Sequence, residues 1–180
     1  MSLKDIEPSG AEKVGFYRIK EILAKDDRSE VEERILASVQ WAGRAAVELQ
    51  QRPEEAFLHY AIALETKILG SQQNVELTYR LSMRTALLAG GTPEKRAEIK
   101  KEVKDLYSIR SKIVHSGHYE VTDADVGKIR LLAIICIMRV LNEKPFISMI
   151  KEQEIDNWFD KAMLSGRLFG DDAQPWASQR

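Results

Sequence analysis

The sequence has almost no cysteine: Cys136 is the single one among 180 residues. A disulfide within the chain is therefore excluded, and the fold needs no oxidising compartment. Long hydrophobic runs are missing too. The longest, from Leu131 to Met138, is far shorter than the roughly 20 residues that cross a bilayer. Residues 1–10 are polar and contain two acids, unlike a signal peptide. We expect a cytoplasmic protein without a membrane segment.

An excess of charge of either sign is also absent. Lys and Arg total 27, Asp and Glu total 28, and the formal net charge is −1. A protein that coats nucleic acid over a broad surface needs a basic excess, so this class is disfavoured, whereas a local basic cleft is not. Hydrophobic residues make up 44% of the chain, enough for the core of one domain of this length.

Strand patterns are scarce, and helical periodicity recurs instead. The spacing of apolar residues and the start and stop signals predict helices over 11–25, 29–50, 53–69, 74–89, 92–115, 122–142 and around 155–163. Thr92 followed by Pro93 is a strong start signal, and Thr122 with Asp125 has the pattern of a capping box. Gly70, Gly90 and Gly117 are the expected stops.

We expect an all-α fold, an up-and-down helical bundle with additional terminal helices. The bundle should span 29–144, after an N-terminal extension over 1–28. A C-terminal helix and a loose tail should follow over 145–180. The segment 122–142 is apolar nearly all round, which predicts a central position in the bundle. The alternative is that one of its faces is buried in a dimer.

Three charged residues occupy positions on apolar helix stripes. Arg110 shares its stripe with Ile99, Val103, Leu106 and Ile113, Glu65 lies on that of Ala61, Leu64 and Ile68, and Arg84 on that of Leu77, Leu81 and Leu88. A buried charge is costly unless it is paired, so we expect Glu65 to pair with Arg84 or Arg110. The alternative is that the stripes lie at the edge of the core and the charges reach water.

His115 follows Arg110 by five residues, which is about 140° around an ideal helix. The two side chains would converge only if the helix frays near His115, as Gly117 suggests. Histidine is suited to acid–base work, and arginine binds phosphate through two parallel hydrogen bonds.

The segment from Leu106 to Gly117 resembles the signature of Apea-like HEPN domains. In that family a Tyr, here Tyr107, precedes an Arg-Ser pair, and a Val-His-Gly-like stretch follows; Ser116 stands where Gly is more common. Residues 63–65, Ala-Leu-Glu, resemble the second-helix motif of the family, and residues 80–86 resemble the third-helix motif. The resemblance covers about residues 38–142.

The resemblance implies a HEPN-type metal-independent endoribonuclease without a cofactor, acting as a toxin or an antiphage defence effector. Arg110 and His115 would be catalytic, and supporting positions would be Ser111, Glu65, Arg84, Tyr107 and Arg80. Single-stranded RNA would be the substrate, and a homodimer would bring two motifs into one cleft. The alternative is a non-catalytic HEPN module for interaction or dimerisation.

Other candidate sites have simpler interpretations. His115 and His118 are three residues apart, but no recognised ligand spacing surrounds them, so we expect no metal. The lysines and arginine between 95 and 104 interleave with acids, which favours a solvated face over an RNA track. Cys136 should be a core residue, and Trp158 and Phe159 should pack on the bundle.

Overall fold

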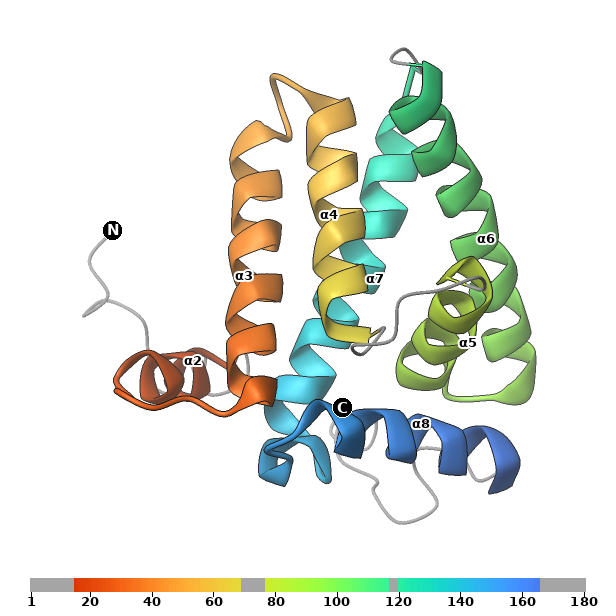
Figure 1. Cartoon of the computed structure of the whole chain (residues 1–180). Coiled ribbons are helices and arrows are strands. Elements are labelled where there is room, and N and C mark those ends of the chain that lie inside the picture. The colour runs from red at the N-terminus through yellow and green to blue at the C-terminus, as the bar shows by residue number, and fades with distance from the viewer. Residues whose placement is uncertain (1–14, 69–76, 117–119, 166–180) are drawn as a thin grey trace, which may run out of the picture.

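A computed structural model describes residues 15–68, 77–116 and 120–165. These residues form seven α-helices and one 3-10 helix, with no strand among them (Figure 1), so the expected all-α fold is confirmed. The elements are α2 (Phe16–Leu23), α3 (Glu30–Glu48), α4 (Pro53–Ile68), α5 (Leu77–Ala89), α6 (Pro93–Ser116), α7 (Asp123–Asn142), η2 (Phe146–Ser148) and α8 (Glu152–Ser165).

The helix starts follow the capping residues of the sequence. The Thr92 hydroxyl accepts a hydrogen bond from the Lys95 backbone N–H at 3.2 Å, and the capping box of Thr122 and Asp125 at the start of α7 is complete. Ser29 begins α3 with a capping box of its own. These bonds satisfy N–H groups that a helix cannot pair internally, which fixes where each helix begins.

Some expected boundaries lie outside the described residues. They are the starts at residues 11 and 74, the stops at Gly70 and Gly117, and the tail after Ser165. The expected burial of Leu77 is wrong. Leu77 is the first residue of α5 and is 43% exposed, so the buried stripe of this helix begins at Leu81.

Helix α7 occupies the centre of the bundle, as its composition predicts. It contacts α2, α3, α4, α5, α6 and η2. In Figure 1, α3 and α4 stand side by side, α6 lies on the opposite flank of α4, and α8 crosses one end of the bundle. The candidate residues on α4 and α6 are therefore held by helices that share α7 as a support.

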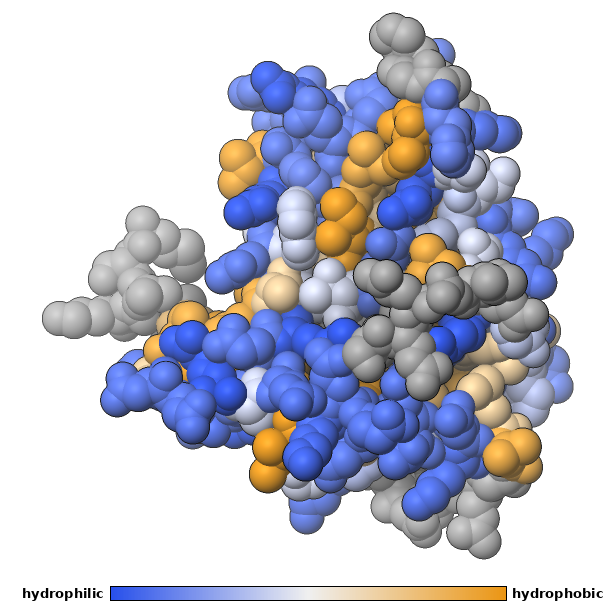
Figure 2. Space-filling view, viewed as in Figure 1, coloured by the Kyte–Doolittle hydropathy of each residue, from blue (hydrophilic) through white to orange (hydrophobic). Residues whose placement is uncertain are grey.

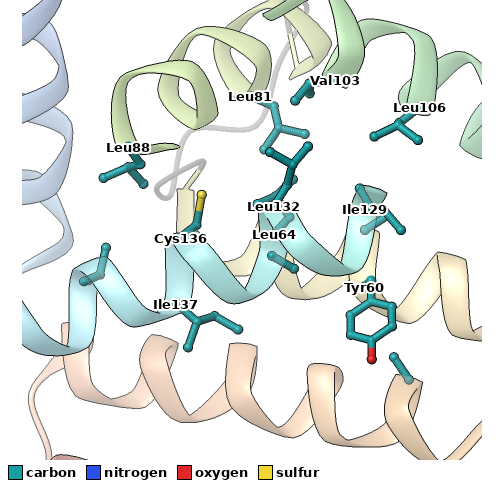
Figure 3. Packing of buried hydrophobic residues seen from close by; sticks show 14 of the residues in the cluster. Tyr60, Leu64, Leu81, Leu88, Val103, Leu106, Ile129, Leu132, Cys136 and Ile137 are labelled. Atoms are coloured by element: carbon teal, nitrogen blue, oxygen red, sulfur yellow. The ribbon is translucent and has the colours of Figure 1, made fainter. Parts of the chain in front are cut away.

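The core gathers around one face of α7. Figure 3 shows Ile129, Leu132 and Cys136 of α7 among apolar side chains of α4, α5 and α6, namely Leu64, Leu81, Val103 and Leu106. Each of these side chains is nearly or fully buried, which stabilises the fold by about 1.5–3 kcal/mol for a large aliphatic residue. Cys136 is buried in this core, as expected.

The opposite face of α7 is not covered by described residues. Leu131 is 59% exposed and Ile134 is 40% exposed, although both are apolar. Ile135 and Met138 lie on the same side and are only partly buried. An apolar helix in a bundle centre was expected to be covered on most sides, and α7 departs from this because its neighbours pack on the other face.

The surface seen in Figure 2 is mostly hydrophilic, in keeping with the large charged fraction of the chain. A band of hydrophobic residues interrupts it over α4, toward the upper end of α6 in this view. In the described part of the chain, no helix combines the length and the hydropathy needed to span a bilayer.

Helix α8 is attached through its aromatic face. Phe159 is 1% exposed, and Trp158 packs edge-on against Phe146 with ring centroids 4.8 Å apart. Ile155 is buried beside them. The expected packing of Trp158 and Phe159 on the bundle is confirmed, so α8 closes one end of the core.

A buried ion pair joins α8 to α5. Arg84 is only 1% exposed, and its Nη1 lies 2.7 Å from Oδ1 of Asp156, which is buried as well. The Arg84 guanidinium also lies over the Phe159 ring, 4.7 Å from its centroid. Burial lowers the pKa of Arg84, and the Asp156 carboxylate opposes this shift. Arg84 was expected to pair with Glu65 or to reach water, and its partner is Asp156 instead.

Replacing Asp156 by asparagine should destabilise the protein strongly. Breaking a buried ion pair leaves a charge without compensation and typically costs about 3–5 kcal/mol, or roughly 6–20 °C in melting temperature for a chain of this size. Thermal unfolding followed by circular dichroism measures it. Asp105→Asn, at an exposed position on α6, is the control and should melt close to the parent. An Asp156→Asn variant as stable as the parent would contradict the structural role of the pair.

Candidate functional site

Arg110 is placed among buried residues by the stripe of α6. Ile99, Val103, Leu106 and Ile113 are buried, as the spacing predicts. The Arg110 side chain keeps 28% of its surface exposed, because it lies at the edge of this stripe. Both alternatives drawn from the sequence are therefore partly met: Arg110 faces inward, and it also reaches solvent.

Glu65 of α4 is the partner of Arg110. The Nε of Arg110 lies 2.8 Å from Oε1 of Glu65, and Nη2 donates to Oε2 at 3.4 Å. The contact is thus a close ion pair with one longer hydrogen bond beside it. The Glu65 side chain is 18% exposed, so the pair is shielded from water but not sealed. The expected pairing of Glu65 with Arg110 is confirmed.

Tyr107 supports the same pair from one turn earlier on α6. Its hydroxyl donates a hydrogen bond to the backbone oxygen of Ala61, at 3.2 Å, and the Arg110 guanidinium lies 5.9 Å from its ring centroid. Burial raises the pKa of Tyr107 well above its ordinary value, and the Glu65 carboxylate raises it further. Tyr107 therefore stays protonated and acts as a donor that fixes α6 against α4.

His115 lies on a different side of α6. The helix continues to Ser116, so His115 belongs to its last turn and is exposed. It lines an open hollow of about 370 Å³ together with Ser108, Ser111 and Lys112. A titratable imidazole, a cation and two hydroxyls are thus combined on one surface of the helix.

Within one chain, the structure does not bring Arg110 and His115 together. The convergence expected from fraying near His115 does not occur, because α6 stays helical through both positions and keeps the side chains about 140° apart. Gly117, the expected terminator, lies outside the described residues.

The residues singled out by the sequence divide into three groups. Glu65, Tyr107 and Arg110 form the first, and His115 with Ser111 forms the second. Arg84 and Arg80 form the third, on α5 and beside Asp156 of α8; Nη2 of Arg80 lies 3.8 Å from the carboxylate. The third group serves the attachment of α8 to α5.

Three residues of these groups were missed by sequence reasoning. Ser108 and Lys112 precede His115 by seven and three residues, a helical spacing that places them on its side. Asp156 precedes Phe159 by three residues, so its position on the apolar side of the last helix was a readable signal. In each case the signal was a polar residue three or seven positions before His115 or Phe159, on the same side of the helix.

His59 has a structural environment of its own. Its Nδ1 lies 2.6 Å from Oε2 of Glu48, and its ring packs on Trp41 with centroids 5.1 Å apart. Among the described residues, which do not include His118, no group of three or more His, Cys, Asp or Glu side chains could hold a metal ion.

The chain was compared with protein-family models, with curated proteins and with solved structures, and none of them matches. The assignment of a function therefore depends on the residues and their geometry. The features available for it are the shielded Arg110–Glu65 pair and the hollow at His115.

Neutralising Glu65 should destabilise the protein to an intermediate degree. Glu65→Gln removes the charge that faces Arg110. The contribution of a partly shielded pair to stability lies between that of an exposed pair and that of a buried pair, so the free energy of unfolding should fall by about 1–3 kcal/mol. Urea unfolding measures this loss. Glu55→Gln is the matched control, since Glu55 lies on the same helix as Glu65 and forms an exposed pair with Arg52, just before the helix. It should cost less than about 0.5 kcal/mol. Equal effects of the two variants would show that Glu65 has no structural role.

Proposed function

We propose that the protein is a metal-independent endoribonuclease of the HEPN type, with His115 as its acid–base residue. The observation that carries the proposal is the open hollow of α6, where His115 lies with Lys112, Ser111 and Ser108. A toxin or antiphage role stays a prediction from the resemblance alone.

The residue types in the hollow fit the cleavage of RNA. The 2′-hydroxyl of RNA is an internal nucleophile: it loses its proton to a base, attacks the adjacent phosphorus and expels the 5′-oxygen, which takes up a proton. The products are a 2′,3′-cyclic phosphate and a new 5′-hydroxyl. A histidine at ordinary pH exchanges both protons, and a lysine stabilises the charge that develops on the phosphate oxygens.

Arg110 would contribute to the site at His115 from a second protomer. It lies about 140° around α6 from His115, and Glu65 holds it there. One phosphate contacts both residues only where a second copy of the chain places its own Arg110 beside the first His115. The exposed 28% of the Arg110 side chain is the part that would meet this phosphate. Two-fold symmetry would then create two equal composite sites.

His115→Ala should abolish cleavage while leaving the fold intact. Losing a general acid–base group typically lowers the rate by about 10²–10⁴. The side chain is exposed, so its removal opens no cavity. Gel analysis of a labelled single-stranded RNA, with EDTA present throughout, measures the rate, and the cyclic phosphate identifies the mechanism. Lys151→Ala, an exposed lysine outside the hollow, is the control and should cleave as the parent does.

A mixing experiment tests the composite site. Arg110→Lys keeps the charge but loses the planar fork, so this variant should also be inactive. Mixed with His115→Ala in equal amounts, it should recover up to about a quarter of the parental rate, because half of the dimers are mixed and each has one intact site. A parental rate for His115→Ala would refute His115 as the acid–base residue, and no recovery on mixing would refute the shared site.

The second candidate is a dimerisation module without catalysis. The exposed side of α7 favours it, since Leu131, Ile134, Ile135 and Met138 follow helical spacing on one face. An apolar face of this kind on a soluble domain commonly marks an interface. A second copy of the chain could cover it by placing the same face of its own α7 against the first.

Charged substitutions on this face should dissociate the dimer. Leu131→Asp combined with Ile134→Asp would bury two carboxylates against apolar side chains, which is strongly unfavourable. Light scattering should give twice the 20.5 kDa chain mass for the parent and the single mass for the variant. Val47→Asp, at an 82% exposed valine of α3, is the control and should remain dimeric. A monomeric parent would refute this candidate and the composite site alike.

A further inference from the structure

An exposed aromatic ring on α5 is bordered by two lysines of α6. Tyr79 lies in the first turn of α5 and is 46% exposed. The Nζ of Lys100 lies 5.1 Å from the centre of its ring, and the Nζ of Lys104 lies 6.0 Å from it. Within the described residues, neither lysine forms an ion pair with a carboxylate. Tyr79 is not a member of the core cluster that the described residues form.

The two lysines lie on the side of α6 that carries His115. At 100° per residue, Lys100, Lys104 and His115 fall within about 60° of one another around the helix axis. Ser111 lies inside this arc, and Ser108 extends it to about 80°. From Lys100 to His115 the helix rises by about 22 Å. Tyr79 and the two lysines thus form one end of a surface strip, and the hollow at His115 forms the other end.

The acidic residues of α6 lie on another side. Glu98, Glu102 and Asp105 line a separate hollow between α6 and α7, together with Lys101 and Lys128. Lys128 pairs with Glu102 at 3.5 Å, and Lys95 pairs with Glu98 at 2.9 Å. The interleaving of charges in the sequence therefore describes the acidic side correctly. It does not describe Lys100 and Lys104, which the helix turns toward Tyr79.

We propose that this strip, defined by Tyr79, Lys100, Lys104, Ser108 and His115, is a track for single-stranded RNA. Phosphates of the strand lie along the lysines, and a base stacks on the exposed part of Tyr79. The inference rests on the proposed function, because the track leads to the hollow where cleavage would occur.

The chemistry of the strip selects a single strand. Aromatic rings beside cations bind unpaired nucleotides without regard to sequence, since every base offers a face for stacking and every nucleotide carries a phosphate. In a duplex the bases are stacked on each other, so Tyr79 has nothing to bind. An acidic peptide would use the lysines but would gain nothing from the ring.

Binding is measured separately from cleavage, with a fluorescent single-stranded RNA whose 2′-hydroxyls are methylated and cannot react. Fluorescence anisotropy gives the Kd at several salt concentrations. The double variant Lys100→Ala with Lys104→Ala should bind at least about tenfold more weakly, and its salt dependence, as the slope of log K against log salt, should fall by about 1.4. Tyr79→Ala should weaken binding by about fivefold or more.

The matched control removes two lysines from the acidic side. Lys101→Ala with Lys128→Ala changes the net charge by the same amount and should bind RNA as the parent does. The track is refuted if the two double variants weaken binding equally, if Tyr79→Ala binds with parental affinity, or if a duplex of the same sequence binds as tightly as the single strand.

The outcomes also separate the track from the proposed activity. If the parent cleaves RNA while the Tyr79 and lysine variants bind and cleave like it, the track is wrong and the ribonuclease proposal stands. If the Tyr79 and lysine variants bind the methylated strand more weakly than the parent but the parent cleaves no RNA, the activity is wrong and the track stands as a binding surface.

Discussion

The fold depends on the burial of one face of α7. The helix contacts every described helix from α2 to α6, and its buried residues, among them Ile129, Leu132 and Cys136, form the centre of the core. Apolar burial has no preferred direction, so it holds these helices together without fixing how they slide or turn against one another. The polar contacts between α4 and α6 fix the relative position and rotation of these two helices.

Two charge pairs complete the arrangement, and both follow from the cost of shielding a charge from water. Arg110 and Glu65 fix α6 against α4, and the Tyr107 hydroxyl adds a bond to the α4 backbone beside them. Arg84 and Asp156 perform the same task at the end of the bundle. The surface of α6 that faces solvent is thereby held on a rigid support, which is the condition for a precise site.

Sequence reasoning was strongest where the information is local. Capping at Thr122 and the inward position of Arg110 depend on residues within one helix, and both could be predicted. Asp156 as the partner of Arg84 could not, because the two are distant in the chain and several acids were available. The exposed side of α7 was hidden by its all-apolar sequence, in which periodicity distinguishes no face. Linear order also concealed how α6 separates Lys100 and Lys104 from its acids.

The different environments of Arg110 and His115 on α6 have an evolutionary consequence. Arg110 is joined to Glu65 and therefore contributes to folding, whereas His115 is exposed and contributes nothing to the core. Selection for a folded chain alone would preserve the arginine and its glutamate but would let the histidine drift. In a set of related chains, an invariant Arg110 would thus report on stability. Retention of His115 has no such structural cause, so it would separate a requirement for the imidazole from the requirement for the fold.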